Sequence, residues 1–438
     1  MAAEPWPEPW QDSPEHAARL DAECDRLIRF ATGARLAGGG FGWLDDVGRP
    51  LPDGVVHTWV TARMTHVFAL ARLRAEARGS AFDAAEAGAL VAHGIAALTG
   101  PLRDHEYGGW HPVVDRGGRP APGAVDGGTR AGAEPERPDG KRMYDHAFVV
   151  LAAASACAAG HPEAPALLAE ALDVVERRFW EQDRGACAES WDRTWTVGEP
   201  YRGANSNMHA VEAFLAAADA TGEARWRERA LRIAERVVHE HARANHWRLI
   251  EHFAADWTPR PEYNRERPAD PFRPYGATVG HWFEWSRLLI TLAEALPEAP
   301  GWLRADAVAL FDAAVREGWR ADGRPGFVYT VDWSGKPLVR TRMHWVAAEA
   351  IAAAAALRGA SGDADYDDWY RVWWEHADAV FLDREHGGWH HELDADARPS
   401  ADVWRGKPDA YHAVQATLLP RLRSAPTIAE ALRRRAVR

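Results

Sequence analysis

The sequence is poor in lysine and lacks any strongly basic segment. Lysine occurs only at Lys141, Lys336 and Lys407, and 52 basic residues stand against 64 acidic ones, which gives a formal charge of −12. A chain without a basic stripe or tail is poorly suited to bind nucleic acid or an anionic lipid surface. We therefore expect neither nucleic acid nor a membrane as a partner.

Cysteine is also scarce, and no long hydrophobic run is present. Cys24, Cys157 and Cys187 are odd in number and widely spaced, which fits neither a disulfide framework nor a pair of zinc ligands. The most apolar run, residues 147–159, is shorter than the ~18 residues that a membrane span needs. Residues 1–17 are acidic and proline-rich, unlike a secretory signal. The sequence thus predicts a cytoplasmic protein with reduced cysteines.

Tryptophan and histidine are what the sequence has in excess. There are 22 tryptophans, against 9 tyrosines and 13 phenylalanines, and 20 histidines. A flat apolar ring with one N–H donor suits the C–H face of a sugar ring, although the packing of a large core uses tryptophan too. The composition therefore favours a carbohydrate ligand without requiring one.

Amphipathic helical patterns recur along the whole chain, separated by alternating short and long connections. Apolar residues at i, i+3, i+4 and i+7, with alanine and leucine dominant, indicate helices rather than strands. Twelve helical segments are predicted, at about 13–36, 57–77, 82–99, 144–159, 162–180, 205–221, 223–244, 275–296, 301–318, 341–358, 363–381 and 408–422. Five connections are short and contain glycine or proline, as helix ends often do. The other six are long.

Several of the long connections share a similar sequence. The matching segments are GFGWLDDVGRPL (40–51), YGGWHPVVDRGGRP (107–120), GFVYTVDWSGKPL (326–338) and GGWHHELDADARP (387–399), with ACAESWDRTW (186–195) a weaker fifth. Aromatic and β-branched residues that flank an Asp/Gly turn predict a short β-hairpin in each of them.

Six helical hairpins, with short turns at one end and long loops at the other, predict an all-α fold, the (α/α)6 barrel. We expect a single catalytic domain over residues 1–438, with about 12 N-terminal and 15 C-terminal residues peripheral. The six inner helices would follow the long loops and run parallel, so that their N-termini and free N–H groups meet at one end. An open α-solenoid is the alternative, and it predicts no such convergence.

The first turns of the proposed inner helices carry polar and tryptophan side chains on one face. They are Trp59 and Arg63, Asn205 and His209, His281 and Glu284, Trp345 and Glu349, and singly Tyr144 and His412. Each alone is compatible with ordinary packing or a solvated helix face. Arg63 is the hardest to explain in that way, because a guanidinium in an apolar run needs a partner. The same feature at every inner helix predicts a functional site at the long-loop end.

Several strings resemble the N-acylglucosamine 2-epimerase superfamily, most closely its aldose–ketose isomerase branch, which comprises mannose and sulfoquinovose isomerases. The strings are HTWVTARM, YRGANSNMHAVEAF, RPYGATVGHWFEW, VYTVDWSGKP, GGWHHELDAD and GKPDAYH, and the resemblance spans about residues 13–422. It implies an (α/α)6 barrel that needs no metal or other cofactor and that acts on a monosaccharide through an enediol.

The resemblance also implies roles for individual residues. His412 would move the proton between C2 and C1, while His281, oriented by Glu284, would serve ring opening and proton transfer at oxygen. The implied sugar ligands are Trp59, Arg63, Tyr144, Asn205, His209, Arg273, Trp345 and Glu349.

Histidine suits this chemistry. Its unperturbed pKa of about 6.5 lets it take and return a proton near neutral pH, and one base on one face of a cis-enediol is enough. Arg63 and His281 would stabilise the charge that develops on O1 and O2. These residues favour a metal-independent isomerase that interconverts D-mannose and D-fructose, with lyxose and xylulose as a further pair.

Two features depart from the nearest members of the branch. Members that handle sulfonated sugars carry glutamine where this chain has His391 and Pro408, so we expect neutral aldoses as substrates. Residues 112–142 form a longer loop, rich in glycine, proline and charge, for which we expect a mobile lid or a disordered segment.

Other functions stay open at this point. A sugar 2-epimerase would use His281 as a second base, and a sulfoquinovose isomerase would share the fold. An inverting glycosidase needs two carboxylates about 6.5–9.5 Å apart, for which Glu284 and Glu349 are candidates. A non-catalytic sugar-binding barrel is a further alternative. A metal-dependent isomerase would use strings such as HEH (239–241) or HHE (390–392). The sequence leaves a homo-oligomer open.

Overall fold

The computed structural model describes residues 10–52, 54–78, 80–121 and 139–435, so most of the predicted lid at 112–142 lies outside the described residues. The α-helices are α1 (Pro14–Ala31), α2 (Thr58–Arg78), α3 (Ala84–Thr99), α4 (Met143–Ala158), α5 (Ala164–Val174), α6 (Ala204–Thr221), α7 (Ala224–Ala234), α8 (Val279–Ala295), α9 (Trp302–Gly318), α10 (His344–Ser361), α11 (Asp365–Val380), α12 (Tyr411–Leu418) and α13 (Ile428–Arg433). All twelve predicted helical segments are confirmed. The short α13 was not predicted, because six residues show too little of a helical period.

Short helical turns of other types extend some of these helices. Two wider π turns, η3 (Val175–Phe179) and η4 (Glu235–Ala242), follow α5 and α7 directly. The 3-10 turns η1 (Trp10–Asp12), η2 (Thr32–Ala34) and η5 (Leu419–Arg421) lie next to α1 and α12. In the described ranges, no helix is long and apolar enough to span a membrane.

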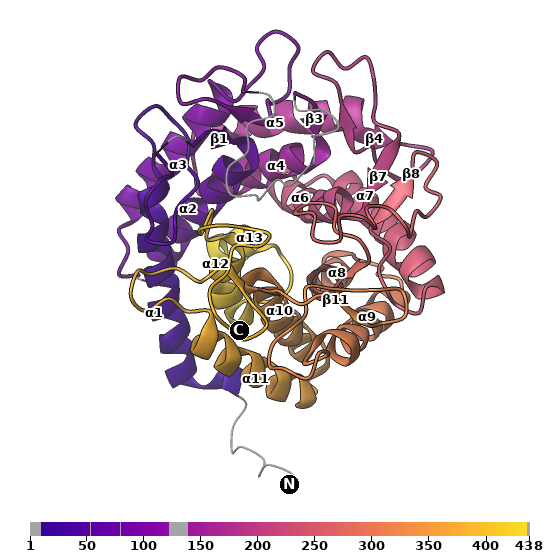
Figure 1. The fold of residues 1–438 in the computed structure, drawn as a ribbon. Helices are drawn as coiled ribbons and strands as arrows, with labels where there is room; N and C mark the ends of the chain where they lie inside the picture. Colours follow the sequence, from indigo (N-terminus) through magenta and orange to yellow (C-terminus); the bar gives the residue numbers. More distant parts are fainter. Residues whose placement is uncertain (1–9, 53, 79, 122–138, 436–438) are drawn as a thin grey trace.

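The helices form two concentric rings (Figure 1). The even-numbered helices α2 to α12 make the inner ring, in which each helix packs on the next and α12 packs on α2. The odd-numbered helices α1 to α11 cover them from outside. This closed ring confirms the (α/α)6 barrel and is incompatible with an open solenoid.

The sequences of the two rings differ as their positions require. In the inner helix α8 every residue from Val279 to Ala293 is buried, and α10 contributes five consecutive alanines, 352–356. The outer helix α7 buries one stripe only, formed by Trp226, Ala230, Ile233 and Ala234. A helix that is surrounded by protein is apolar on all sides, whereas a surface helix needs a single apolar face.

Short strands lie in the long loops and tie each loop to the next. They are β1 (Val56–His57), β2 (Val113–Val114), β3 (Lys141–Arg142), β4 (Trp180–Glu181), β5 (Ala186–Cys187), β6 (Ser190–Trp191), β7 (Tyr201–Gly203), β8 (His252–Ala254), β9 (Ala277–Thr278), β10 (Thr330–Val331), β11 (Pro337–Val339), β12 (Arg342–Met343) and β13 (Glu392–Leu393). The strand just before each of α2, α4, α6, α8 and α10 pairs antiparallel with a strand of the following long loop: β1–β2, β3–β6, β7–β8, β9–β10 and β12–β13. These pairings fix where these five inner helices begin.

The predicted hairpins occur in the long loops, most of them in a minimal form. The segment at 326–338 is the hairpin β10–β11. The others are closed by isolated bridges: Leu44–Pro50, Val114–Pro120, Trp191–Gly198 and Leu393–Pro399, together with Phe253–Pro259, which was not predicted.

The end of the chain is better packed than the sequence suggested. Helix α13 contacts α2, α4 and α6, and residues 428–432 are buried. Thr427 donates its backbone N–H to Asp219 of α6 at 2.8 Å. The last residues were expected to be peripheral, but this part of them closes the barrel at the short-turn end.

Candidate active site

A cavity opens at the long-loop end of the barrel, and the first turns of all six inner helices line it. The helical lining residues are Trp59, Arg63, Tyr144, Asn205, His209, His281, Glu284, His344, Trp345 and His412. The loops add Pro271, Phe272, Pro274, Tyr329, His391, Trp404, Pro408 and Asp409. The structure therefore brings together nine of the predicted site residues. Arg273 and Glu349 are not in the cavity wall.

Arg63 is held as a fixed cation in this wall. Its guanidinium donates to the Tyr144 hydroxyl at 2.9 Å and pairs with Asp409 at 3.3 Å, and it lies over the ring of Phe148 at 4.3 Å. Burial favours the neutral form, but Tyr144 and Asp409 outweigh it and raise the pKa of Arg63 above its ordinary value. Asp409 is the partner that a buried arginine requires.

His412, on α12, is held by a buried carboxylate. Its Nδ1 lies 2.9 Å from Oε1 of Glu349, whose other oxygen accepts from Nε of Arg287 at 3.0 Å. Because a carboxylate oxygen only accepts, Nδ1 carries the proton and the neutral ring keeps a free lone pair on Nε2. Burial and then Arg63 lower the pKa of His412 well below its ordinary value.

His281, on α8, has a different carboxylate partner from the predicted one. Its Nδ1 lies 2.9 and 3.0 Å from the two oxygens of Glu251, a loop residue that directly precedes β8. The expectation that Glu284 orients His281 is therefore wrong. The spacing i, i+3 does place both residues on one helix face, but Glu284 lies one turn deeper, 3.8 Å from Nδ1 of His209.

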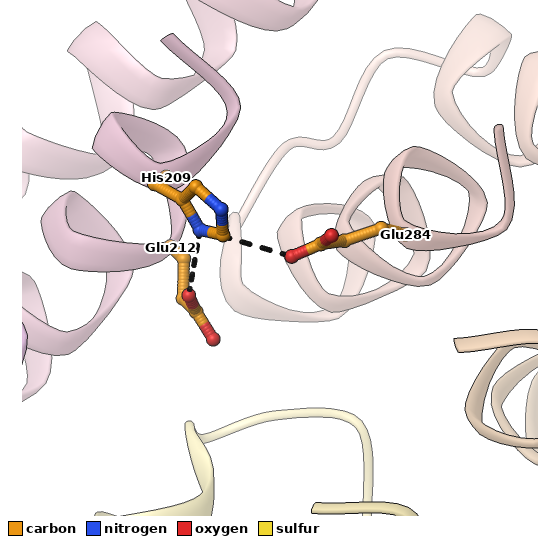
Figure 2. A group of neighbouring side chains, drawn as sticks. All are labelled: His209, Glu212 and Glu284. Carbon is orange, nitrogen blue, oxygen red and sulfur yellow. Dashed lines mark hydrogen bonds and ion pairs between the residues drawn. The ribbon is translucent and has the colours of Figure 1, made fainter. Parts of the chain in front are cut away.

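Two buried glutamates lie beside His209 (Figure 2). Glu212 of α6 and Glu284 of α8 flank His209, at 3.5 and 3.8 Å from its Nδ1. Burial, reinforced by the charge of Glu349, raises the pKa of Glu284 well above its ordinary value. Burial acts the same way on Glu212, but His209 and Arg287 outweigh it and lower its pKa.

The same three residues form the arrangement closest to a metal site. Ligand atoms of His209, Glu212 and Glu284 all lie within 4.8 Å of one another. Arg287 lies 3.7 Å from Glu284, so a buried cation already accompanies these carboxylates and would repel a metal ion. In the ranges that the structure describes, the strings at 239–241 and 390–392 contribute to no group of this kind.

A known protein family matches most of the chain. The profile of the family described as N-acylglucosamine 2-epimerase (GlcNAc 2-epimerase) matches residues 39–416. The chain belongs to this family.

Relatives within the family cover almost the whole chain. A D-mannose isomerase of Thermobifida fusca is 53% identical over 97% of this chain and 98% of its own length. A D-mannose isomerase of Pseudomonas cannabina pv. alisalensis is 50% identical over 97% of both chains. At this identity and coverage, the chain is an isomerase of the family.

Solved structures agree on the fold. A D-mannose isomerase crystal structure superposes with a TM-score of 0.82 at 28% identity and covers 92% of this chain and 97% of its own. A cellobiose 2-epimerase from Spirochaeta thermophila gives a TM-score of 0.77 at 22% identity, over 93% and 96% of the two chains, which supports the fold alone.

Two of the predicted sugar ligands have other contacts in this family member. Glu349 lies one helical turn below Trp345, behind His412, where it binds that ring instead of facing the cavity. The Arg273 guanidinium pairs with Glu199 at 2.7 Å and lies over the ring of Tyr201 at 4.0 Å. The position of Glu349 follows from the spacing i, i+4, which moves a side chain one turn along the axis.

Several polar atoms in the cavity wall have no hydrogen-bond partner among the described residues. They are Nε of Arg63, Oδ1 of Asn205, Oε1 of Glu284 and Nε2 of His344. His344 was not predicted; its ring stacks on His391 with the centroids 3.8 Å apart. Leaving buried polar atoms unpaired is costly, so these four atoms favour a polar ligand in the cavity.

Two loop residues that the sequence did not predict complete the site. Asp409 and Glu251 bind the two predicted residues that most need a charged partner, Arg63 and His281. Asp409 lies inside the string GKPDAYH, so proximity to His412 was a usable signal. Glu251 had no comparable signal, because its loop shows no helical period.

Proposed function

We propose that the protein is a metal-independent aldose–ketose isomerase that interconverts D-mannose and D-fructose through a cis-enediol. The observation that carries the proposal is the pair of histidines, His412 and His281, which line one cavity and each bind a carboxylate through Nδ1. The names of the relatives at 50% and 53% identity support mannose as the aldose.

The isomerisation needs two proton transfers at carbon and two at oxygen, starting from the open-chain aldose. His412 Nε2 takes the proton from C2 while the protonated ring of His281 gives its proton to O1, which leaves a neutral enediol. His281 then takes the proton of O2 as His412 returns the first proton to C1, which gives the ketose. Both histidines end as they began, and assistance of this kind contributes about 10²–10⁴ in rate.

The rest of the cavity binds and orients the sugar. Trp345 lies against both catalytic histidines, with ring centroids 5.3 Å from His281 and 5.7 Å from His412, and offers an apolar surface next to the reacting carbons. Arg63 supplies positive charge for the oxygen that becomes negative in the transition state. Sugar hydroxyls would satisfy the unpaired atoms of Asn205, Glu284 and His344.

The test is incubation with mannose, glucose, lyxose and sulfoquinovose in D₂O with EDTA, followed by NMR. We expect fructose from mannose, with deuterium incorporated at the carbon that receives the proton. Activity that is lost with EDTA and returns with Mn²⁺ or Co²⁺ contradicts the metal-free mechanism. The absence of a ketose from every aldose contradicts the function.

A 2-epimerase is the second candidate, because both histidines contact the same Trp345 ring. Epimerisation needs a base on each face of the sugar, and His281 would be the second one. Glucose appearing from mannose at a rate equal to or above that of fructose would favour this alternative. The glycosidase alternative loses its support, because Glu349 is not in the cavity wall.

A further inference from the structure

We propose that Glu251 is the positioning residue of His281: its carboxylate holds Nδ1 and fixes the orientation of the ring, so that Nε2 is the nitrogen presented to the substrate. The inference rests on the proposed function, because that function names the reaction. The contact between Glu251 and His281 is seen in the structure whatever the reaction is.

Glu251 is held rigidly between two inner helices. Its backbone carbonyl accepts from the N–H of Ala204, the first residue of α6, at 2.9 Å. Its carboxylate accepts from the N–H of Thr278, the residue before α8, at 3.4 Å. The side chain is only 3% exposed. A carboxylate fixed at the starts of both helices can orient the His281 ring without losing entropy at each turnover.

The two histidine–carboxylate pairs of the site differ in one respect. One oxygen of Glu349 binds His412 and the other binds Arg287, so the arginine offsets the negative charge that His412 experiences. Both oxygens of Glu251 lie at 2.9 and 3.0 Å from Nδ1 of His281. Among the described residues, Glu251 pairs with no arginine or lysine.

The contact with Glu251 fixes the tautomer of His281. A carboxylate oxygen only accepts, so Nδ1 carries the proton and Nε2 is the nitrogen that the ring presents to the substrate. Because both oxygens of Glu251 hold Nδ1, Nε2 of His281 meets the sugar oxygens from a fixed position.

The variant that isolates the charge is Glu251→Gln, because glutamine keeps the size and the accepting oxygen but not the charge. We expect kcat to fall at least tenfold with KM little changed, since the amide holds Nδ1 less firmly and the ring is less well oriented in the transition state. Glu251→Asp, which restores the carboxylate at a greater distance, should recover part of kcat.

Asp306→Asn is the matched control. Asp306 pairs with Nδ1 of His239 at 2.7 Å, on the outer helix α9 and the turn η4, so the variant removes a similar charge away from the cavity. It should leave kcat, KM and the pH profile as in the wild type. Circular dichroism of all variants checks that the barrel is intact.

A measurement without substrate separates this inference from the proposed function. In ¹⁵N-labelled protein, the Nδ1–H signal of His281, assigned with His281→Ala, should show a proton bound to a carboxylate and should shift strongly in Glu251→Gln. If the wild type isomerises no aldose but the signal behaves in this way, only the proposed function fails. If the wild type is active and Glu251→Gln retains its kcat, the inference on Glu251 is wrong.

Discussion

His412 and His281 present chemically different rings to the same cavity. His412 is buried beside Arg63 and binds a carboxylate that Arg287 shares, whereas His281 binds both oxygens of Glu251, one of which also accepts from the N–H of Thr278. In the proposed mechanism the two rings serve different steps because their neighbours differ. Enzymes commonly separate acid and base roles in this manner.

Substitution of the two histidines should therefore produce different defects. His412→Ala should abolish exchange of the C2 hydrogen with D₂O together with isomerisation, a loss of at least ~10² in kcat. His281→Ala should also be slow but should retain some deuterium exchange, because the enediolate can still form from the open-chain sugar. NMR in D₂O measures both. If His412→Ala keeps near wild-type exchange and His281→Ala loses it, the roles are reversed.

The pH dependence of the reaction should reflect the environment of His412. Burial and Arg63 lower the pKa of this ring well below 6.5, and the base is active only when it is neutral. Activity should therefore persist as the pH falls through 6.5 and decline only at lower pH, once the lowered pKa is reached. A profile of kcat/KM against pH in the wild type tests this. A half-maximal point at or above pH 6.5 on the acid side would show that the ring titrates as an ordinary histidine.

At the scale of elements, a strand of only two or three residues precedes five of the six inner helices, α2, α4, α6, α8 and α10, and sets where each begins. Strand β9 pairs with β10 immediately before α8, and His281 follows in the first turn of that helix. Because these strands are short, one disturbed pairing is enough to move a catalytic side chain by a fraction of an ångström. Displacements of about 1 Å can cost 10²-fold in rate.

Gly276, directly before β9, tests this link. It has φ +89°, and a Cβ there would collide with the backbone carbonyl of Val331 in β10. We expect Gly276→Ala to lower kcat at least tenfold with a mostly helical circular dichroism spectrum retained. Gly222, at the C-terminal end of α6, has φ +75°, but a Cβ at this position would meet no atom within 4 Å, so Gly222→Ala is the matched control.

Gly222→Ala should lower the free energy of unfolding by about 1–2 kcal/mol, because alanine is strained in a left-handed conformation, and should leave kcat unchanged. Urea unfolding monitored by fluorescence gives the stabilities of both variants. Equal losses of kcat in the two variants would show that the backbone conformation alone, and not the β9–β10 contact, is responsible.

At the scale of the whole molecule, the charge distribution suits a neutral substrate. The chain carries −12, and the cavity cation Arg63 is already paired with Asp409. The negative charge of the protein would therefore repel an anionic sugar, and the guanidinium of Arg63 is already paired with a carboxylate.

We accordingly expect sulfoquinovose to be a poor substrate relative to mannose. The kcat/KM of mannose should also change little with ionic strength, because a neutral sugar is not steered by charge. Kinetic measurements with both sugars at low and high salt check this expectation. A higher kcat/KM for the sulfonated sugar would mean that another group in the cavity compensates its charge.

The sequence determined the helices, the ring and most of the helical part of the cavity wall. Periodicity, loop lengths and the polar pairs at helix starts are local features, and a closed ring of parallel inner helices brings all six starts together whatever the details of packing. For this reason the sequence alone could place Trp59, Arg63, Tyr144, Asn205, His209, Trp345 and His412 at one cavity.

Only the tertiary structure decided which side chains bind one another. His281 pairs with Glu251, 30 residues away, instead of Glu284 on its own helix, and Glu349 lies behind His412 instead of in the cavity. Arg63 and Asp409 are 346 residues apart, and Arg273 turns to Glu199. Such contacts depend on how far each loop reaches over the barrel and on small rotations of packed helices. Sequence spacing gives the face and the turn of a residue, but it does not give the distance to a partner on another element.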